Sequence, residues 1–272
     1  MRTTLIAAIA ALSLAACAST GGGSVPGFSA QAPPAFLTGE EAADFSKQVE
    51  RNLAEKGARL AIVFRTGETR DKLPDGISYT HGAFWTFVPI ALDDGRTING
   101  YAVYNLYHGD GKTLPVDRSY LHQDFPFDFV APTAVDDVAV IIPSPEMQRR
   151  ILAIMQSPDY RKLHVESYSL VSNPHDIKHQ NCNEFMLDVI AAAAWETTDM
   201  AQIKANLRQH FRPAEVKTSL LERLFAPIAQ KRIKTDDQGS RIMTVTYESM
   251  AAFMKDNGLL QETYILHRTR AS

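Results

Sequence analysis

The amino-acid sequence predicts an α+β domain with a mostly antiparallel sheet. Aromatic and β-branched runs of strand length follow one another at residues 59–65, 79–89 and 98–107, and turn signals such as Asp93-Asp94-Gly95 separate them. Stretches with helical periodicity lie before and after this group of strands instead of between each pair. Strands grouped apart from helices favour an antiparallel sheet with helices packed on it.

Periodicity and composition locate the individual elements. Phe45, Val49 and Leu53 recur at the spacing of one helix face, and Pro145 stands near the start of a second helix, where proline is tolerated. The predicted helices span residues 39–56, 145–157, 181–196 and 248–257, with two more amphipathic stretches between Met200 and Ala229. The predicted strands span residues 59–65, 79–89, 98–107, 138–142, 163–172, 241–247 and 262–267.

The first residues have the pattern of a secretory signal peptide. Arg2 supplies the positive charge, residues 5–14 supply a short apolar segment, and the pattern ends in Leu14-Ala15-Ala16-Cys17. The segment is too short to span a membrane, and residues 1–16 are expected to be removed. Its end resembles the bacterial lipobox, which implies that Cys17 becomes lipidated. An ordinary signal peptide with an incidental cysteine is the alternative.

The lipobox resemblance also implies a location. Ala18 follows Cys17 where an Asp would imply retention in the inner membrane, so the resemblance points to the outer membrane. Residues 17–36 are rich in Gly, Ser, Ala and Pro and carry no charge, which favours a flexible tether. Residues 37–272 are long enough for a single folded domain. We therefore expect a periplasmic lipoprotein whose lipid anchor holds it to the outer membrane.

Composition argues against several classes of function. The net charge of −3 gives no indication of a basic surface that would bind nucleic acid, so nucleic acid is not expected as a partner. The sequence has no metal-ligand spacing, no glycine-rich phosphate loop and no Gly-x-Ser-x-Gly elbow, so no metal or cofactor is expected. The acidic and aromatic run at residues 124–129 either lines a substrate groove or forms a proline-shaped loop over the sheet. The loop is the preferred interpretation.

Cys182 is the most informative residue of the folded part. The chain has two cysteines, so lipidation of Cys17 would leave Cys182 without a disulfide partner in an oxidising compartment. Asn181 is a good helix N-cap and Glu184 is spaced for a capping box, which places Cys182 at the first helical position. Backbone N–H groups and the helix dipole favour thiolate there. The helix that follows is almost entirely apolar and is expected to be buried; a buried, inert thiol is therefore the alternative to a reactive one.

A thiol nucleophile needs a base, and His81 is the best candidate among the eight histidines. His81 lies in an aromatic strand, and Gly82 beside it allows another element to approach closely. His164 is a weaker candidate, and His175 and His179 lie in a polar loop where histidines are usually solvated. Taken singly, His81 would more often be a core or surface histidine than a base.

The order of these motifs resembles a known group of enzymes. Thr80-His81-Gly82 on a strand, followed far downstream by Asn181-Cys182 at a helix start, resembles the circularly permuted branch of the NlpC-type papain-like enzymes, which includes lecithin retinol acyltransferase. The segments Asn181-Cys182-Asn183-Glu184-Phe185 and Tyr168-Ser169-Leu170 look like corresponding segments of that branch. The resemblance covers residues 60–196. The whole chain also resembles a family of bacterial lipoproteins known as domain of unknown function 2145.

The papain-like resemblance implies a fold and a set of roles. The fold is an antiparallel sheet packed on a central helix that starts at the nucleophile Cys182, with His81 as the base. In these enzymes a third polar residue comes from the strand after the histidine strand. Here the preferred residue for this role is Asn105, on one strand face with Tyr107. The alternative is His108, on the other face with Tyr104 and at the strand end.

The oxyanion and substrate side is expected to include the backbone N–H of Cys182 together with Tyr168 and Asn181. Gln180 is expected to face solvent instead, as residues before an N-cap often do. Two functions remain open at this stage. One is a thiol amidase, peptidase or acyltransferase acting on a peptidoglycan peptide or a lipid ester. The other is a non-catalytic binding or scaffold lipoprotein with a degenerate papain-like fold.

Overall fold

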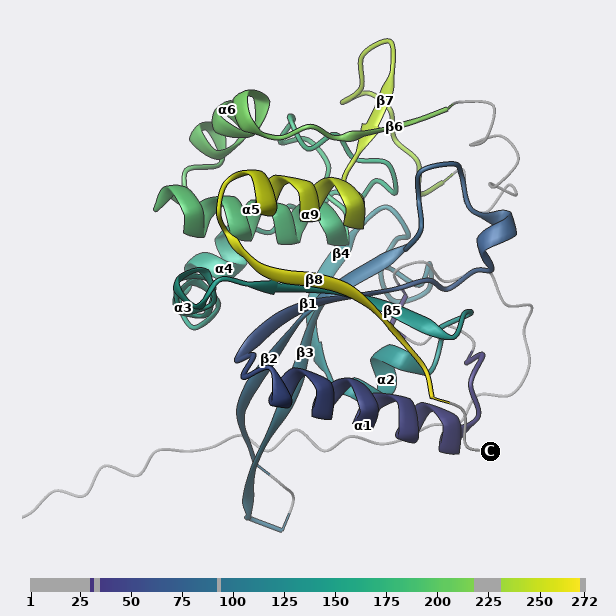
Figure 1. Cartoon of the computed structure of the whole chain (residues 1–272). Helices are drawn as coiled ribbons and strands as arrows, with labels where there is room; N and C mark the ends of the chain where they lie inside the picture. Colours follow the sequence, from purple (N-terminus) through teal and green to yellow (C-terminus); the bar gives the residue numbers. More distant parts are fainter. Residues whose placement is uncertain (1–29, 32–34, 92–93, 218–230, 270–272) are drawn as a thin grey trace, which may run out of the picture.

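A computed structural model describes residues 30–31, 35–91, 94–217 and 231–269 (Figure 1). Cys17, with most of the signal and tether region, and the second amphipathic stretch before Ala229 lie outside the described residues. The centre of the fold is a six-stranded sheet in the order β4-β3-β2-β1-β5-β8, and every neighbouring pair is antiparallel. The predicted α+β class with an antiparallel sheet is therefore confirmed.

The sheet strands are β1 (Leu60–Arg65), β2 (His81–Ala91), β3 (Thr97–His108), β4 (Ser119–Asp124), β5 (Asp137–Pro143) and β8 (Leu260–His267). A separate two-stranded ribbon consists of β6 (Ala214–Val216) and β7 (Ile242–Thr244). The helices are α1 (Gly39–Glu55), α2 (Pro126–Val130), α3 (Pro145–Met155), α4 (Asp159–Lys162), α5 (Cys182–Trp195), α6 (Met200–His210) and α9 (Tyr247–Asp256), with a short 3₁₀ turn at Arg70–Lys72.

Helices cover both faces of the sheet. In the view of Figure 1, α1 and α2 lie below the sheet and α5, α6 and α9 lie above it. Side chains alternate across each strand, so Ile62 and Phe64 of β1 pack toward α5 whereas Ala61 and Val63 pack toward α1. Because helices cover both faces of the sheet, all six positions of β1 are buried.

The α5 helix is the central element of the upper layer. Its residues from Cys182 to Ala193 are all buried, as its apolar sequence predicts. It lies against β2 at Gly82, where an added Cβ would stand 2.4 Å from Met186 Cε and 2.8 Å from the Phe64 ring. Glycine at this position therefore permits the close approach of the helix to the strand.

The polar residues of α5 are paired with a lysine from the next helix. Lys204 of α6 places Nζ 2.7 Å from Glu184 Oε1 and 2.7 Å from Asp188 Oδ1. All three side chains are almost completely buried. The expected capping box is therefore wrong, because Glu184 binds Lys204 instead of reaching back to Asn181.

Two of the predicted strands need correction. Residues 163–172 do not form a strand: they leave α4 as an irregular segment, with only isolated bridges at Ser167 and Tyr168. The Tyr168 N–H bonds to Asp117 and the Leu170 N–H to Arg232, so loops and not a ladder satisfy this backbone. Leu163 and Tyr168 of this segment belong to the same buried core as α5. Burial gives the segment the apolar composition that is also typical of a strand.

The predicted strand at 241–247 is limited to β7, because Thr246 acts as the N-cap of α9 and starts a helix at Tyr247. The short elements β4, α2, α4 and β6 were not predicted. In the run at 124–129, Asp124 ends β4 and residues 126–130 form α2. Phe129 is buried under the sheet whereas Phe125 and Phe127 are exposed, so the run is neither a simple covering loop nor a groove wall.

Candidate functional site

Cys182 is the first residue of α5, as predicted. The Asn181 side chain caps the helix by accepting the Glu184 N–H at 3.0 Å, and Asn181 itself is extended. The Cys182 side chain is 3 % exposed, and its Sγ lies 3.6 Å from Asn183 Oδ1. The thiol therefore occupies a nearly fully buried position at the positive end of a helix.

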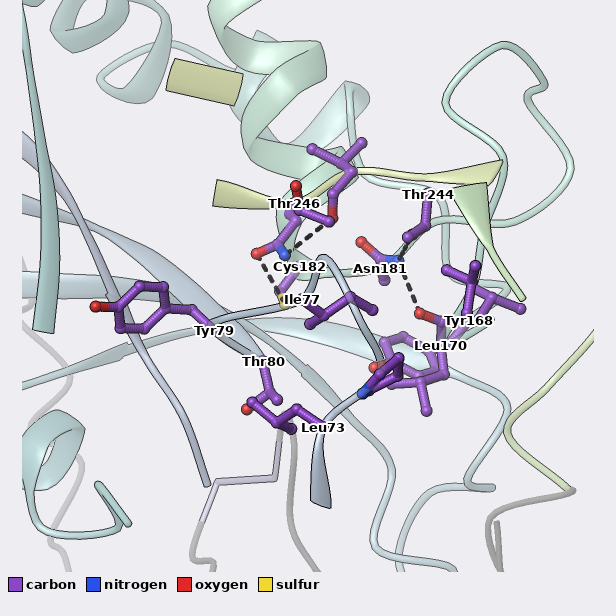
Figure 2. Close-up of a pocket in the computed structure, with 15 residues that line it drawn as sticks. Leu73, Ile77, Tyr79, Thr80, Tyr168, Leu170, Asn181, Cys182, Thr244 and Thr246 are labelled. Atoms are coloured by element: carbon purple, nitrogen blue, oxygen red, sulfur yellow. Dashed lines mark hydrogen bonds between the residues drawn. The ribbon is translucent and has the colours of Figure 1, made fainter. Parts of the chain in front are cut away.

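A small cavity of about 60 Å³ opens beside Cys182 (Figure 2). Its walls are largely apolar, with Leu73, Ile77 and Leu170 among the nearest side chains. Thr80, Asn181, Asn183, Thr244 and Thr246 add polar atoms at its rim. The residues come from the loop before β2, the segment before α5 and the stretch leading into α9. Distant parts of the chain thus meet at the thiol.

His81 is the first residue of β2 and is fully buried. Its Nε2 lies 2.9 Å from Asn105 Oδ1, and Asn105 Nδ2 donates to Asp124 Oδ2 at 3.2 Å. Because an ionised carboxylate can only accept, the amide nitrogen faces Asp124 and the amide oxygen faces the imidazole. Nε2 must then carry the proton, so the neutral ring has its lone pair on Nδ1.

Further contacts hold this chain of hydrogen bonds in place. The Tyr107 hydroxyl donates to Asp124 Oδ2 at 2.5 Å, and His122 Nε2 lies 3.1 Å from Asp124 Oδ1. The rings of Tyr107 and Phe129 flank His81 at 5.5 and 5.7 Å between centroids. Asp124 and Tyr107 were not identified from the sequence, although the alternation of a strand at 119–124 would have pointed to the carboxylate.

Burial sets the protonation of the imidazole. The absence of water around His81 lowers its pKa well below the usual value, and the nearby charge of Arg65 lowers it further. The hydrogen bond to Asn105 opposes this shift. His81 is thus neutral at pH 7, as a proton acceptor must be.

The starts of β2 and α5 lie together. Met186, one turn after Cys182, contacts Gly82, the residue after His81. Thr80, the residue before His81, lines the same cavity as Cys182. The residues on either side of His81 thus face α5 and the Cys182 cavity, whereas the His81 ring itself packs against Tyr107 and Phe129.

The other candidate residues differ in their surroundings. Tyr168 is fully buried and lines the Cys182 cavity. Asn181 also lines the cavity, but its amide nitrogen donates to the Leu170 carbonyl at 3.1 Å while its oxygen caps the helix. His108 places Nδ1 2.8 Å from the Gly109 carbonyl and its ring 5.4 Å from that of Tyr168. Of the two candidates for the third role, Asn105 is the one hydrogen-bonded to His81.

Two expectations about polar residues near the helix start were wrong. Gln180 is fully buried and donates to Asp188 at 2.8 Å, so it does not face solvent. His179 is also buried, and its ring nitrogens lie 2.8 Å from Ser167 Oγ and 2.7 Å from Asp236 Oδ1. In both cases the polar loop is held inward by hydrogen bonds to side chains that approach from other segments.

Across residues 35–91, 94–217 and 231–269, no group of three or more His, Cys, Asp or Glu side chains is arranged to hold a metal ion. None of the helices in this part of the chain combines the length and apolar character needed to cross a bilayer. The polar groups that line the Cys182 cavity are a thiol, hydroxyls and amides.

Fold and site together define an α+β protein with a cysteine at the start of a buried helix and a buried His–Asn–Asp chain on the adjoining strands. The chain belongs to the bacterial family described as "Uncharacterized protein conserved in bacteria (DUF2145)", whose profile matches residues 52–254. No curated protein and no solved structure matches the chain. The matched region includes His81, Asn105, Tyr168 and Cys182, whereas Cys17 lies outside it.

Proposed function

We propose that this protein is a thiol hydrolase or acyltransferase of the permuted papain-like kind. The observation that carries the proposal is the hydrogen-bonded chain His81–Asn105–Asp124 on the strands beside the start of α5, where Cys182 lies. An imidazole with a fixed tautomer and a thiol at a helix N-terminus are the two groups that a cysteine nucleophile mechanism requires. The order of elements along the chain also supports the permuted relationship, since β2, which begins at His81, precedes α5, which begins at Cys182.

The reaction has two halves. The Cys182 sulfur attacks the carbonyl carbon of an ester or amide, and the leaving group departs from the acyl-enzyme. A water or another acceptor then attacks the thioester and releases the sulfur. His81 Nδ1 accepts the thiol proton and gives it to the departing alcohol or amine. It then accepts a proton from the attacking water or acceptor and returns it to the sulfur, while Asn105 holds its tautomer. In this proposal the Cys182 backbone N–H stabilises the oxyanion, and Tyr168, which lines the same cavity, adds its hydroxyl as a second donor.

The cavity narrows the class of substrate. About 60 Å³ is small compared with the several hundred Å³ of a site that encloses a whole small molecule. Its apolar wall at Leu73, Ile77 and Leu170 suits a short acyl group or a small apolar side chain next to the scissile carbonyl. Peptide and short-acyl substrates therefore fit the proposal better than long lipid chains.

The proposed location is the periplasmic face of the outer membrane, reached through lipid on Cys17. The support is the sequence pattern Leu14-Ala15-Ala16-Cys17. Growth with labelled palmitate should label the wild-type protein and leave Cys17→Ser unlabelled. Equal labelling of both proteins, or of neither, would reject the anchor.

The activity is tested with short and long acyl esters and with small peptides, followed by turnover and by intact mass. We expect a short-chain acyl adduct on Cys182 and turnover that is lost in Cys182→Ala. The competing function is a scaffold, which the low exposure of Cys182 (3 %) favours. A folded wild-type protein that forms no adduct with any of these substrates, and whose thiol stays inert to alkylation, would establish the scaffold instead.

A further inference from the structure

Three large aromatic side chains are exposed around α2, which lies below the sheet in Figure 1. Phe36, Phe125 and Phe127 are 52, 47 and 42 % exposed. The Phe36 N–H donates to the Ala131 carbonyl at 3.0 Å, and the Ala131 N–H donates to the Phe127 carbonyl at 3.0 Å. Phe125 is the N-cap residue of the same helix. The three phenylalanines therefore lie in one small region of the surface, which we call the α2 aromatic patch.

The exposure of these side chains is informative because they occur together. Single exposed apolar side chains are ordinary on protein surfaces, whereas a group of aromatic ones is typical of a surface that contacts another molecule or a membrane. Phe129 of the same helix is fully buried and already anchors α2 to the sheet. The α2 aromatic patch is therefore a candidate contact surface.

The chain that leads from Cys17 enters the domain next to this patch. The Gln31 side chain accepts a hydrogen bond from the Tyr120 hydroxyl at 2.8 Å, and its Nε2 lies 2.9 Å from His122 Nε2. Both partners belong to β4, the strand that runs directly into the patch. A few residues beyond Gln31 the chain reaches Phe36, which is part of the patch. The proposed lipid anchor is thus connected to the domain at the α2 aromatic patch.

The connection is short compared with the domain. Cys17 and Gln31 are 14 residues apart. Fully extended, such a segment reaches about 50 Å, and a Gly- and Ser-rich coil of this length averages about 20 Å. A globular domain of the size of residues 37–272 has a radius of gyration of about 18 Å and is about 45 Å across. A lipid on Cys17 would therefore hold the α2 side of the domain closer to the bilayer than the α5 side.

We propose that the α2 aromatic patch inserts into the lipid–water interface of the membrane that anchors the protein. This inference rests on the proposed lipid anchor at Cys17. Aromatic side chains are favoured at the level of the lipid headgroups, and shallow insertion removes their apolar surface from water. Lipid on one residue leaves the orientation of the domain open, whereas three inserted rings fix it. Since α2 and α5 lie on opposite faces of the sheet, this orientation turns the α5 layer toward the periplasm, where a peptide substrate can reach it.

The charges around the patch favour insertion of apolar groups over attraction to anionic headgroups. Asp128 is exposed within α2, and Glu40 and Glu41 lie in the first turn of α1. Arg268, which approaches this turn, is paired with Glu41 at 2.9 Å and with Asp136 at 2.7 Å. Docking should therefore need no anionic lipid and should not weaken at high salt.

The test is the quenching of a tryptophan introduced into the patch, in the full-length lipidated protein reconstituted in phosphatidylcholine vesicles with brominated acyl chains. Phe127→Trp keeps an aromatic side chain and reports contact with lipid. Ile177→Trp is the matched control: Ile177 is 55 % exposed and lies two residues after His175, whose carbonyl accepts a bond from Arg208 of α6, on the opposite face of the sheet. After subtraction of the wild-type signal, brominated lipid should reduce Phe127→Trp emission at least about twofold and Ile177→Trp emission by less than about a tenth, at low and high salt alike.

Phe36→Trp is a second reporter in case Phe127→Trp does not fold, and it should be quenched to the same extent. Flotation with the vesicles and palmitate labelling of the same samples separate docking from anchoring. Labelled protein that floats while both patch tryptophans stay as unquenched as Ile177→Trp would overturn docking and leave the anchor in place. Unquenched tryptophans together with cross-links between two chains at the patch would assign it to a second copy instead. Protein that carries no label and does not float would reject the anchor and the docking with it.

Discussion

The buried pair of carboxyl groups in α5 leads to a prediction about stability and pH. Glu184 and Asp188 share one cation, Lys204, whose Nζ lies 2.7 Å from an oxygen of each. Both carboxyl groups are fully buried, and Glu184 Oε2 has no hydrogen-bond partner among the described residues. Burial raises the pKa of Glu184 from 4.5 to about 8, with Lys204 opposing the shift. Glu184 is thus protonated at pH 6 in the folded protein and ionised in the unfolded chain.

The direction of the pH effect follows from this difference. A group whose pKa is raised on folding stabilises the folded state fully below its unfolded pKa, and this stability is lost as pH rises through the folded pKa. For Glu184 the loss runs from about pH 4.5 to about pH 8. The shift of roughly 3.5 units corresponds to at most about 5 kcal/mol over that window, since each unit is worth about 1.4 kcal/mol.

Urea denaturation of the wild type and of Glu184→Gln at pH 5, 6.5 and 8 measures this effect. The neutral amide imitates the protonated acid, so the variant should lack the part of the decline that Glu184 causes. The unfolding free energy of Glu184→Gln, relative to that of the wild type, should therefore increase as pH rises. Parallel pH profiles for the two proteins would refute the assignment of a raised pKa to Glu184.

Three further predictions concern packing and the imidazole chain. Gly82→Ala should lower the unfolding free energy by about 1–3 kcal/mol because its methyl group would meet Met186, and Met186→Ala should recover part of the loss in urea melts. Asn105→Ala should slow acylation at least about tenfold, seen by intact mass, since the imidazole loses its orienting partner; an unchanged rate would remove Asn105 from the site. Tyr107→Phe should cost about 1–3 kcal/mol by leaving Asp124 short of a donor, and equal urea midpoints would contradict this.

Local rules in the sequence were enough to find the helix start and one face of a strand. Asn181 and Cys182 were placed correctly because an N-cap depends on neighbouring residues alone. Asn105 was selected through the papain-like resemblance, with His108 on the opposite strand face as the alternative, and the pairing of β2 with β3 brings Asn105 to His81. These features involve short-range patterns that tertiary packing left intact.

Long-range partners account for what the sequence did not predict. The capping box failed because Lys204, on another helix, competes for Glu184. Arg65 was not identified from the sequence as buried; its guanidinium lies over the Phe129 ring of α2, more than sixty residues away in the chain. Residues 163–172 had the composition of a strand because Leu163 and Tyr168 are buried, although loops satisfy the backbone there. In each case the deciding contact lies far away in the chain.

The central claim is that His81 serves Cys182 as its base, and the most direct test is the rate at which a short activated ester is turned over through the Cys182 acyl-enzyme. Wild type and His267→Ala, which removes an exposed histidine far from the site in the chain, should form and hydrolyse the acyl-enzyme at equal rates. His81→Ala should both form and hydrolyse the acyl-enzyme at least about a hundredfold more slowly, because the thiol and the attacking water both lose their base. Hydrolysis in His81→Ala as fast as in His267→Ala would contradict the account.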